Sequence, residues 1–300
     1  MRNASAMCLT PSREWTFRKA CGTFLGLIVF FSLFAPRVFA QVADADAFEK
    51  NDNVRLVAVR EGPSVAKVYA QLTNCTEVTV TLVLTLTNAV ASEPLPLTVD
   101  SMGRTSFELV TIHGAGRGAA WGYGVGYYWQ YGRRGDGVIS KTVYDLPYRH
   151  GSYRVTQGEM GSKTHTRGSG SEYAIDWAMP IGTVICAARE GTVVALRQDS
   201  TVGVMNPKFA SYGNFVLIRH EDGTFAEYGH LKRKGVLVWL GQHVARRGVI
   251  GLSGGTGYSS GPHLHFGVFQ NIDGQTRKSI PVQFQTKEET VETLKAGNVY

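Results

Sequence analysis

Residues 263–269 constrain this chain more than any other segment, because they predict a strand that carries two histidines. The segment contains His263, Leu264 and His265, followed by further β-forming residues. Successive side chains on a strand point to opposite faces, so both histidines share one face and Leu264 points to the other. Two imidazoles are costly to bury without partners, and neutral imidazole is a common zinc ligand. The segment therefore predicts β structure that gathers further metal ligands beside this strand.

The composition fits an all-β protein with one large domain or two modest ones. The chain has 300 residues, of which 43% are hydrophobic and 35 are glycine. Many glycines together with few long amphipathic stretches predict strands that are joined by many turns.

Residues 1–40 predict a secretory signal peptide. Basic residues precede an apolar run over residues 21–35, and Val38 and Ala40 supply small side chains for cleavage after Ala40. The alternative is an uncleaved anchor, but the run is shorter than the ~20 apolar residues of a spanning helix. We therefore expect an exported protein, periplasmic or extracellular, with no stable membrane insertion after cleavage.

The charge and the cysteines exclude some classes of protein. The signal segment holds five basic residues and one acidic residue, so its removal lowers the formal net charge from +7 to +3. No basic run or aromatic-basic module indicates nucleic-acid binding. Only Cys75 and Cys186 remain after residue 40. A disulfide is possible in an oxidising compartment, but we expect two separate buried thiols.

The remaining chain divides into two β-rich parts after a flexible polar segment over residues 41–52. Alternating β-formers predict an N-terminal β-domain over residues 53–147, of immunoglobulin-like β-sandwich type. Its aromatic stretch over residues 121–131 alternates with glycine; the rings could stack on sugars, but we expect them to pack against neighbouring strands. Residues 148–284 predict a second, antiparallel all-β domain. The charged tail 285–300 could hold a short helix over 286–296.

The second domain contains enough candidate ligands for a catalytic metal site. Such a zinc site has three protein ligands and an open position for water. The histidine pair can supply two ligands, or one ligand and one neighbouring histidine. Asp176 lies inside an otherwise apolar strand, so it needs a cationic partner if it is buried. The other candidates are His165, His220, His230, His243 and Glu172.

An ordered set of motifs over residues 152–284 resembles the lysostaphin/LytM-type zinc metalloendopeptidases, which cut peptidoglycan. The set begins with Tyr-Ala-Ile-Asp at 173–176 and Tyr-Gly-Asn-Phe-Val at 212–216. It continues with Tyr-Gly-His-Leu at 228–231 and ends with Gly-Pro-His-Leu-His-Phe at 261–266. The chain resembles a subgroup that has an extra N-terminal β-domain.

The resemblance implies a role for each histidine. It implies that His165, Asp176 and His265 hold one Zn²⁺ per chain, and that His230 and His263 line the site without binding the metal. The usual family spacing puts the first histidine four residues before the aspartate, where this chain has Glu172. Because zinc favours nitrogen ligands, we expect His165 rather than Glu172.

The implied activity is hydrolysis of peptide bonds in peptidoglycan cross-links or stem peptides. We expect His263 to be the general base and His230 to hydrogen-bond the oxyanion, although these roles could be exchanged. The alternative is a non-catalytic cell-wall binding or regulatory module with a degenerate site. The sequence leaves open the oligomeric state and the role of the N-terminal domain.

Overall fold

The computed structural model describes residues 14–15, 53–116, 120–137, 142–291 and 293–300. Apart from one short 3₁₀ helix, η1 (Pro207–Tyr212), the regular secondary structure of these residues is β-strand, so the all-β prediction is confirmed. The expected signal peptide and the flexible segment 41–52 lie outside the described residues, apart from β1 (Glu14–Trp15), which pairs with β8. No helix in the described ranges is long and apolar enough to cross a membrane.

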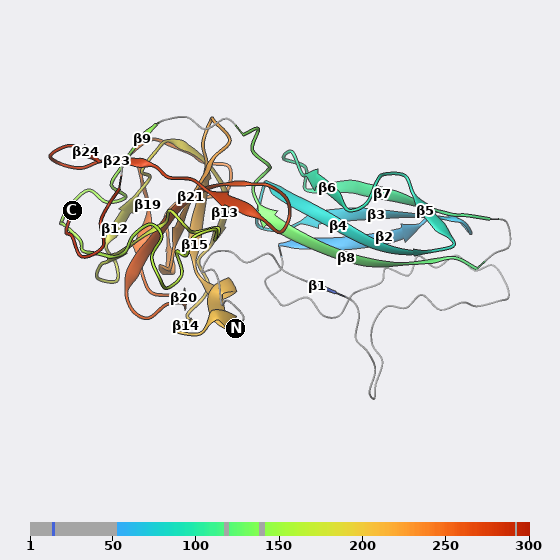
Figure 1. Ribbon diagram of the computed structural model, residues 1–300, viewed down its shortest axis with the longest axis horizontal. Coiled ribbons are helices and arrows are strands. Elements are labelled where there is room, and N and C mark those ends of the chain that lie inside the picture. The colour runs from blue at the N-terminus through green and yellow to red at the C-terminus, as the bar shows by residue number, and fades with distance from the viewer. Residues whose placement is uncertain (1–13, 16–52, 117–119, 138–141, 292) are drawn as a thin grey trace.

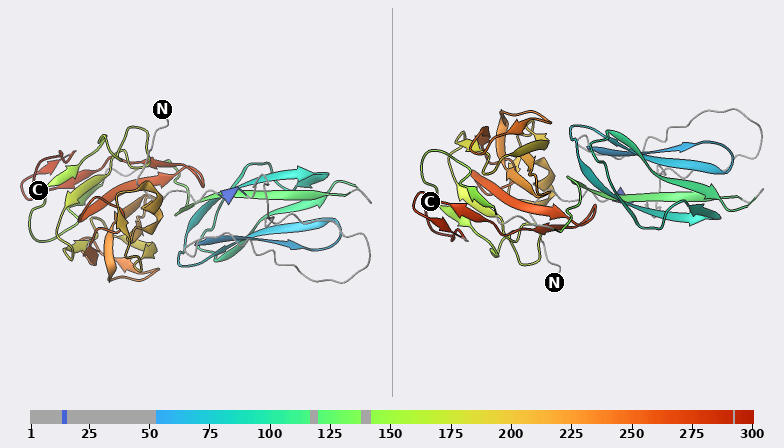
Figure 2. Two further views of the ribbon diagram at one scale, coloured as in Figure 1. Left: turned by 90° about the horizontal axis from the view of Figure 1, so that it is seen from below. Right: turned by 90° about the horizontal axis from the view of Figure 1, so that it is seen from above.

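The N-terminal part is a pair of antiparallel four-stranded sheets that face each other (Figure 2). The first sheet has the order β1-β8-β4-β6 and the second β2-β3-β7-β5. Alternation in β4 turns Val78, Val80 and Leu82 inward, where they have no exposed surface. The strands are β2 (Val54–Arg60), β3 (Val65–Leu72), β4 (Val78–Thr87), β5 (Ala89–Ala91), β6 (Leu97–Asp100), β7 (Ser106–Gly114) and β8 (Gly122–Tyr131). The closer likeness to immunoglobulin domains stays a prediction.

Most rings of the aromatic stretch over residues 121–131 pack inward, as expected, rather than forming an exposed sugar-stacking platform. Trp121, Tyr127, Trp129 and Tyr131 are all buried in the core between the two sheets. Cys75 and Cys186 are also buried, and their thiols are free, which confirms the expectation of two separate cysteines.

The second part, where Figure 1 labels β13, β15 and β21, is built on one antiparallel sheet. The strand order is β10-β11-β21-β16-β15-β13-β18, and β22 also pairs with β21. Leu264, Phe266 and Val268 point from β21 into a core on one face of this sheet. The strands are β10 (Val155–Gln157), β11 (Ile175–Ala178), β13 (Gly191–Arg197), β15 (Phe215–Arg219), β16 (Phe225–Gly229), β18 (His243–Val244), β21 (His263–Asn271) and β22 (Arg277–Ser279).

Three small sheets surround the central sheet. They join β12, β19 and β17; β14 and β20; and β24, β23 and β9. The helix considered for residues 286–296 is wrong for the described part of that segment, where Thr290–Val291 pair with β23. The strands are β9 (Val143–Asp145), β12 (Val184–Cys186), β14 (Gly203–Val204), β17 (Leu231–Val236), β19 (Val249–Ser253), β20 (Gly257–Tyr258), β23 (Gln283–Gln285) and β24 (Thr290–Val291).

The N-terminal sandwich packs on the face of the central sheet that also bears the histidine pair. Phe215, Leu217, Phe225 and Phe269 leave that face and share one hydrophobic core with the sandwich. Phe269 lies on β21 in the same alternation as His265, four residues away. The sandwich therefore packs against the strand that carries both histidines.

Candidate metal centre

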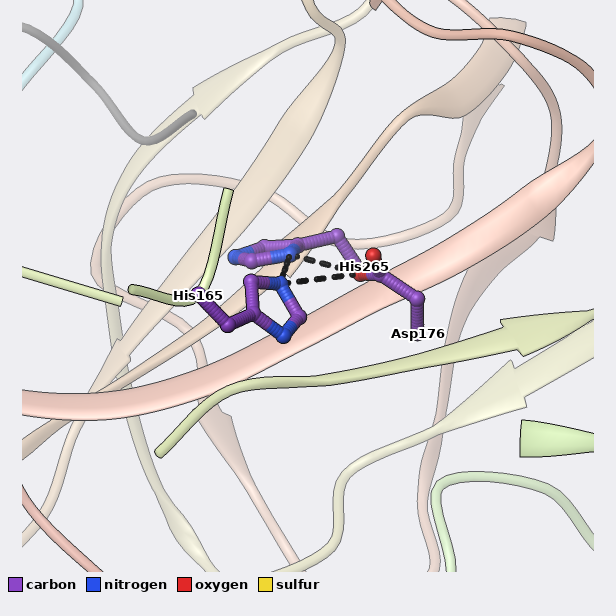
Figure 3. Close-up of side chains that lie close together, drawn as sticks. All are labelled: His165, Asp176 and His265. Atoms are coloured by element: carbon purple, nitrogen blue, oxygen red, sulfur yellow. Dashed lines mark hydrogen bonds and ion pairs between the residues drawn. The ribbon is translucent and has the colours of Figure 1, made fainter. Parts of the chain in front are cut away.

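Three of the five predicted site residues converge on one buried cluster: His165, Asp176 and His265 (Figure 3). His265 Nδ1 lies 2.9 Å from Asp176 Oδ1. His165 Nε2 lies 3.4 Å from the same carboxylate oxygen and 3.4 Å from His265 Nδ1. The cluster therefore presents two nitrogens and one oxygen to a common point.

These separations fit a zinc ion. Zinc ligands at 2.0–2.1 Å in tetrahedral geometry lie roughly 3.3 Å from one another, close to the three distances of the cluster. Imidazole nitrogen and carboxylate oxygen are ordinary zinc ligands. The cluster has three members among the residues that the structure describes, which suits a site with one open position.

The central sheet fixes two of the three donors. Asp176 on β11 and His265 on β21 are direct partners across antiparallel strands, so their side chains leave the same face side by side. The neighbouring β11 residues Ile175 and Trp177 point to the core on the opposite face. The otherwise apolar strand β11 thus places the carboxylate of Asp176 in a buried position.

The third donor comes from the loop between β10 and β11. His165 has no exposed surface, and its Nδ1 lies 3.2 Å from the carbonyl oxygen of Gly158. A carbonyl only accepts, so Nδ1 carries the hydrogen and Nε2 keeps the lone pair that faces the cluster.

Glu172, the alternative metal ligand, makes a hydrogen bond within the loop instead. Its Oε2 accepts a hydrogen bond of 2.9 Å from the backbone N–H of Gly168, within the polar loop that follows His165. Glu172 is not a member of the cluster. The longer loop lets His165 reach Asp176 although eleven residues separate them in the sequence.

The electrostatics of the cluster favour an ionised carboxylate. Burial disfavours the charge on Asp176, but the facing rings of His165 and His265 and their hydrogen bonds outweigh it and hold the pKa of this carboxyl well below its usual range. A charged carboxylate between two imidazoles is the form that a metal ligand requires.

The other two predicted residues, His230 and His263, lie beside the cluster. Their ring centroids are 4.4 Å apart, and the centroid of His230 is 5.9 Å from that of His265. His230 has φ = 60°, in the left-handed region that is uncommon outside glycine, where the chain turns from β16 into β17. Strained backbone of this kind is typical of functional positions.

Backbone carbonyls hold both rings in one tautomer. His230 Nδ1 lies 2.6 Å from the carbonyl oxygen of Thr256, and His263 Nδ1 lies 2.8 Å from that of Gly261. Each Nδ1 therefore donates, and each Nε2 keeps its lone pair. Burial, reinforced by the neighbouring His263 and His265, holds the pKa of His230 well below its usual range, so its ring is neutral at neutral pH.

Two further candidate histidines are not members of the cluster. His220 follows β15, and its Nδ1 donates to the carbonyl oxygen of Glu190 over 2.7 Å. His243 is exposed on the edge strand β18. Sequence reasoning missed Gln157, whose side-chain amide donates to Asp176 Oδ2 over 3.1 Å. Only its polar character at a strand end could have drawn attention to it.

Comparison with protein families identifies the part of the chain that holds most of this cluster. Residues 170–278 match the model of Peptidase family M23. This part of the chain is a peptidase M23 domain. Asp176, His230, His263 and His265 lie within the matched residues, and His165 precedes them.

Several curated proteins are similar in sequence to part of this chain. An uncharacterized metalloprotease of Buchnera aphidicola is 40% identical over 105 residues, which are 35% of this chain and 24% of that protein. Peptidoglycan DD-endopeptidase ShyA of Vibrio cholerae is 43% identical over 91 residues, 30% of this chain and 18% of ShyA. Lysostaphin of Staphylococcus simulans is 33% identical over 116 residues, 38% of this chain and 21% of lysostaphin. The chain thus spans a quarter or less of the length of these relatives.

Among solved structures, the catalytic domain of lysostaphin from Staphylococcus simulans has a TM-score of 0.29 and 25% sequence identity, covering 43% of this chain and 88% of that one.

Proposed function

We propose that this chain is a zinc metalloendopeptidase that hydrolyses peptide bonds in peptidoglycan. The observation that supports this proposal most strongly is the convergence of His165, Asp176 and His265, whose donor atoms are 2.9–3.4 Å apart. Two more histidines, in a fixed tautomer, lie next to them. This combination offers a metal site together with groups that can move a proton.

In this proposal His165 Nε2, Asp176 Oδ1 and His265 Nδ1 hold one zinc ion per chain. The chemistry that zinc supplies when bound is polarisation of a carbonyl and a lowered pKa for water. The buried setting of the three side chains keeps them oriented and limits the access of bulk water to the donor atoms. Because the residues that the structure describes offer three donors in this cluster, catalysis is favoured over a purely structural zinc site, which four protein ligands would close.

We assign the proton transfer to His263. Its Nδ1 donates to Gly261, so its Nε2 lone pair can accept a proton from an attacking water. His263 is only partly buried, whereas His230 is buried, and burial makes a protonated ring more costly at His230. His263 is therefore the better general base.

His230 would act on the oxyanion only after it gains a proton at Nε2. In the neutral tautomer its single N–H is committed to Thr256, which leaves a lone pair on the other nitrogen. A lone pair can orient a water molecule, whereas stabilisation of an oxyanion requires a donor. The part of His230 in the reaction therefore depends on its protonation during the catalytic cycle.

The substrate class comes from the relatives. ShyA and ShyC of Vibrio cholerae are named peptidoglycan DD-endopeptidases, and they share 43% and 40% identity with this chain over 91 residues. We propose peptidoglycan peptides as the partner of this chain and the periplasm or the cell exterior as its location, which agrees with the signal sequence expected over residues 1–40. We also propose that residues 53–147 form an N-terminal β-domain and that residues 148–284 form the peptidase domain.

A digestion experiment tests this function. Purified full-length protein is incubated with isolated peptidoglycan, and the released peptides are identified by mass spectrometry, with and without a zinc chelator. The proposal predicts peptide-bond products that disappear on chelation and return when zinc is added. Binding to peptidoglycan without any released product would instead support the alternative, a non-catalytic cell-wall module.

A further inference from the structure

Gln157 lies opposite Asp176 because a β-bulge interrupts the pairing of β10 with β11. Val155 pairs with Trp177, and a regular ladder would then place Thr156 opposite Asp176. The register shifts between Val155 and Gln157, so Gln157 takes that position instead. Bulges of this kind redirect a side chain and are frequent beside active sites. Here the bulge turns a long polar side chain toward the carboxylate of the cluster.

The amide of Gln157 uses all of its hydrogen-bonding capacity. Its Nε2 donates to Asp176 Oδ2 over 3.1 Å and to Thr164 Oγ1 over 2.7 Å. Its Oε1 accepts from the backbone N–H groups of Lys163 and Thr164, over 3.1 and 3.2 Å. Backbone N–H groups can only donate, so these contacts also fix which end of the amide is oxygen.

These four hydrogen bonds connect two members of the cluster, Asp176 and His165, which come from different parts of the chain. One end of the amide holds the Asp176 oxygen that faces away from His265, which leaves Oδ1 toward both imidazoles. The other end holds the backbone immediately before His165. The next residue, Gly158, accepts the hydrogen bond from His165 Nδ1. Residues 157–158 thus contact both His165, which comes from the loop, and Asp176, which comes from β11.

The surroundings of Gln157 leave little freedom for its side chain. It is 7% exposed. A Cβ at Gly161 would lie 2.5 Å from Gln157 Cγ, so the loop can pass over this side chain only because residue 161 is glycine. The amide is therefore held in one place by packing as well as by its bonds.

We propose that Gln157 is a positioning residue for the metal centre. Its side chain holds the His165 loop and the Asp176 carboxylate in place beside His265. This inference rests on the proposed function, because it assumes that the cluster binds zinc. Residues that hydrogen-bond to metal ligands fix the orientation of those ligands, and their loss weakens metal binding or activity by roughly 10- to 100-fold.

The test measures zinc affinity of the full-length chain by competition with a chromophoric chelator. Gln157→Met keeps the length of the side chain and removes every hydrogen bond. We expect its zinc dissociation constant to rise by roughly 10- to 100-fold. The absorption spectrum of the cobalt-substituted variant should also change, because the ligand geometry is relaxed. If this variant fails to fold, Gln157→Asn, which is one methylene shorter, provides the same measurement.

Thr156→Val is the matched control. Thr156 lies on the same strand and is exposed, and its hydroxyl reaches only the backbone carbonyl of Asp176. It should bind zinc like the unmodified chain. A Gln157→Met protein that folds and retains both the zinc affinity and the cobalt spectrum of the unmodified chain would overturn this inference alone. Failure of the unmodified chain to bind zinc would overturn the proposed function and this inference with it.

Discussion

Gly229 lies directly opposite His265 across β16 and β21, and its missing side chain gives the imidazole the room it occupies. A Cβ at Gly229 would lie 3.3 Å from His265 Cβ and 3.5 Å from its Cδ2. On the other side of the ring, Nδ1 reaches Asp176. The ring is thus held between a carboxylate and a glycine.

Valine at position 229 should displace this ring. Its branched side chain would need the space next to His265 Cδ2, so Nδ1 would move from its place beside Asp176 Oδ1. We expect Gly229→Val to weaken zinc binding by about 10-fold, the lower end of the range for lost orientation of a ligand. Gly122→Val in β8 is the matched control, because a Cβ there meets no atom within 4 Å. Equal zinc affinity in the two variants would contradict the packing described here.

Alanine at His263 or His230 should abolish most peptide cleavage. Loss of a general base costs roughly 10²- to 10⁴-fold in rate, and we expect at least the lower value for His263→Ala. His243→Ala removes an exposed histidine on β18 and should cleave peptidoglycan at the unmodified rate. The rates of peptide release by the variants and the unmodified chain are compared by chromatography. Full activity in His263→Ala would remove this residue from the mechanism.

Glu172 and His165 can be distinguished by their contribution to metal binding. His165→Ala removes a donor of the cluster, so the purified chain should lose stoichiometric zinc. Glu172→Gln should keep it, because the carboxylate of Glu172 bonds to the backbone of Gly168 instead. Elemental analysis of the two purified variants gives the answer. Zinc loss in Glu172→Gln with retention in His165→Ala would reverse the assignment.

Much of this architecture could be predicted because the strands have strong local signals. The alternation of Val78, Val80 and Leu82 predicted a strand in the N-terminal part, and the structure has β4 there. The β-formers of residues 191–197 also favour a strand, and these residues form β13. The face shared by His263 and His265 also follows from alternation alone.

Other features depend on contacts between distant residues, which the sequence does not display. The β-formers of residues 236–239 favour a strand there, but the chain pairs over Leu231–Val236 because β17 joins β19 through Leu231 and Ser253. The charged Lys-Arg-Lys stretch over residues 232–234 favours a turn, yet it lies in β17, an edge strand of its sheet, where exposed charges are tolerated. Gln157 was missed because only the bulge places it opposite Asp176.

His220 should make the stability of the fold depend on pH. Burial lowers the pKa of this histidine to about 4, and its Nε2 has no hydrogen-bond partner. In the unfolded chain the pKa is about 6.5, so the unfolded state binds more protons between pH 6.5 and 4. The free energy of unfolding should therefore fall as the pH drops through this window, by about 3 kcal/mol for this group.

Urea denaturation at several pH values measures this effect. In His220→Gln the contribution of this group is absent, so the free energy of unfolding should fall less between pH 6.5 and 4 than in the unmodified chain. At pH values above 6.5 the difference between the two proteins should be constant. Parallel curves across the whole acidic range would contradict a neutral, buried His220.

Native mass spectrometry of the zinc content tests the central claim most directly. The claim is that His265 holds the metal while His263, two residues away on the same face, does not. The unmodified chain and His263→Ala should each carry one zinc ion, and His265→Ala should carry none. Zinc retained in His265→Ala, or lost in His263→Ala, would contradict this division of roles between the two histidines.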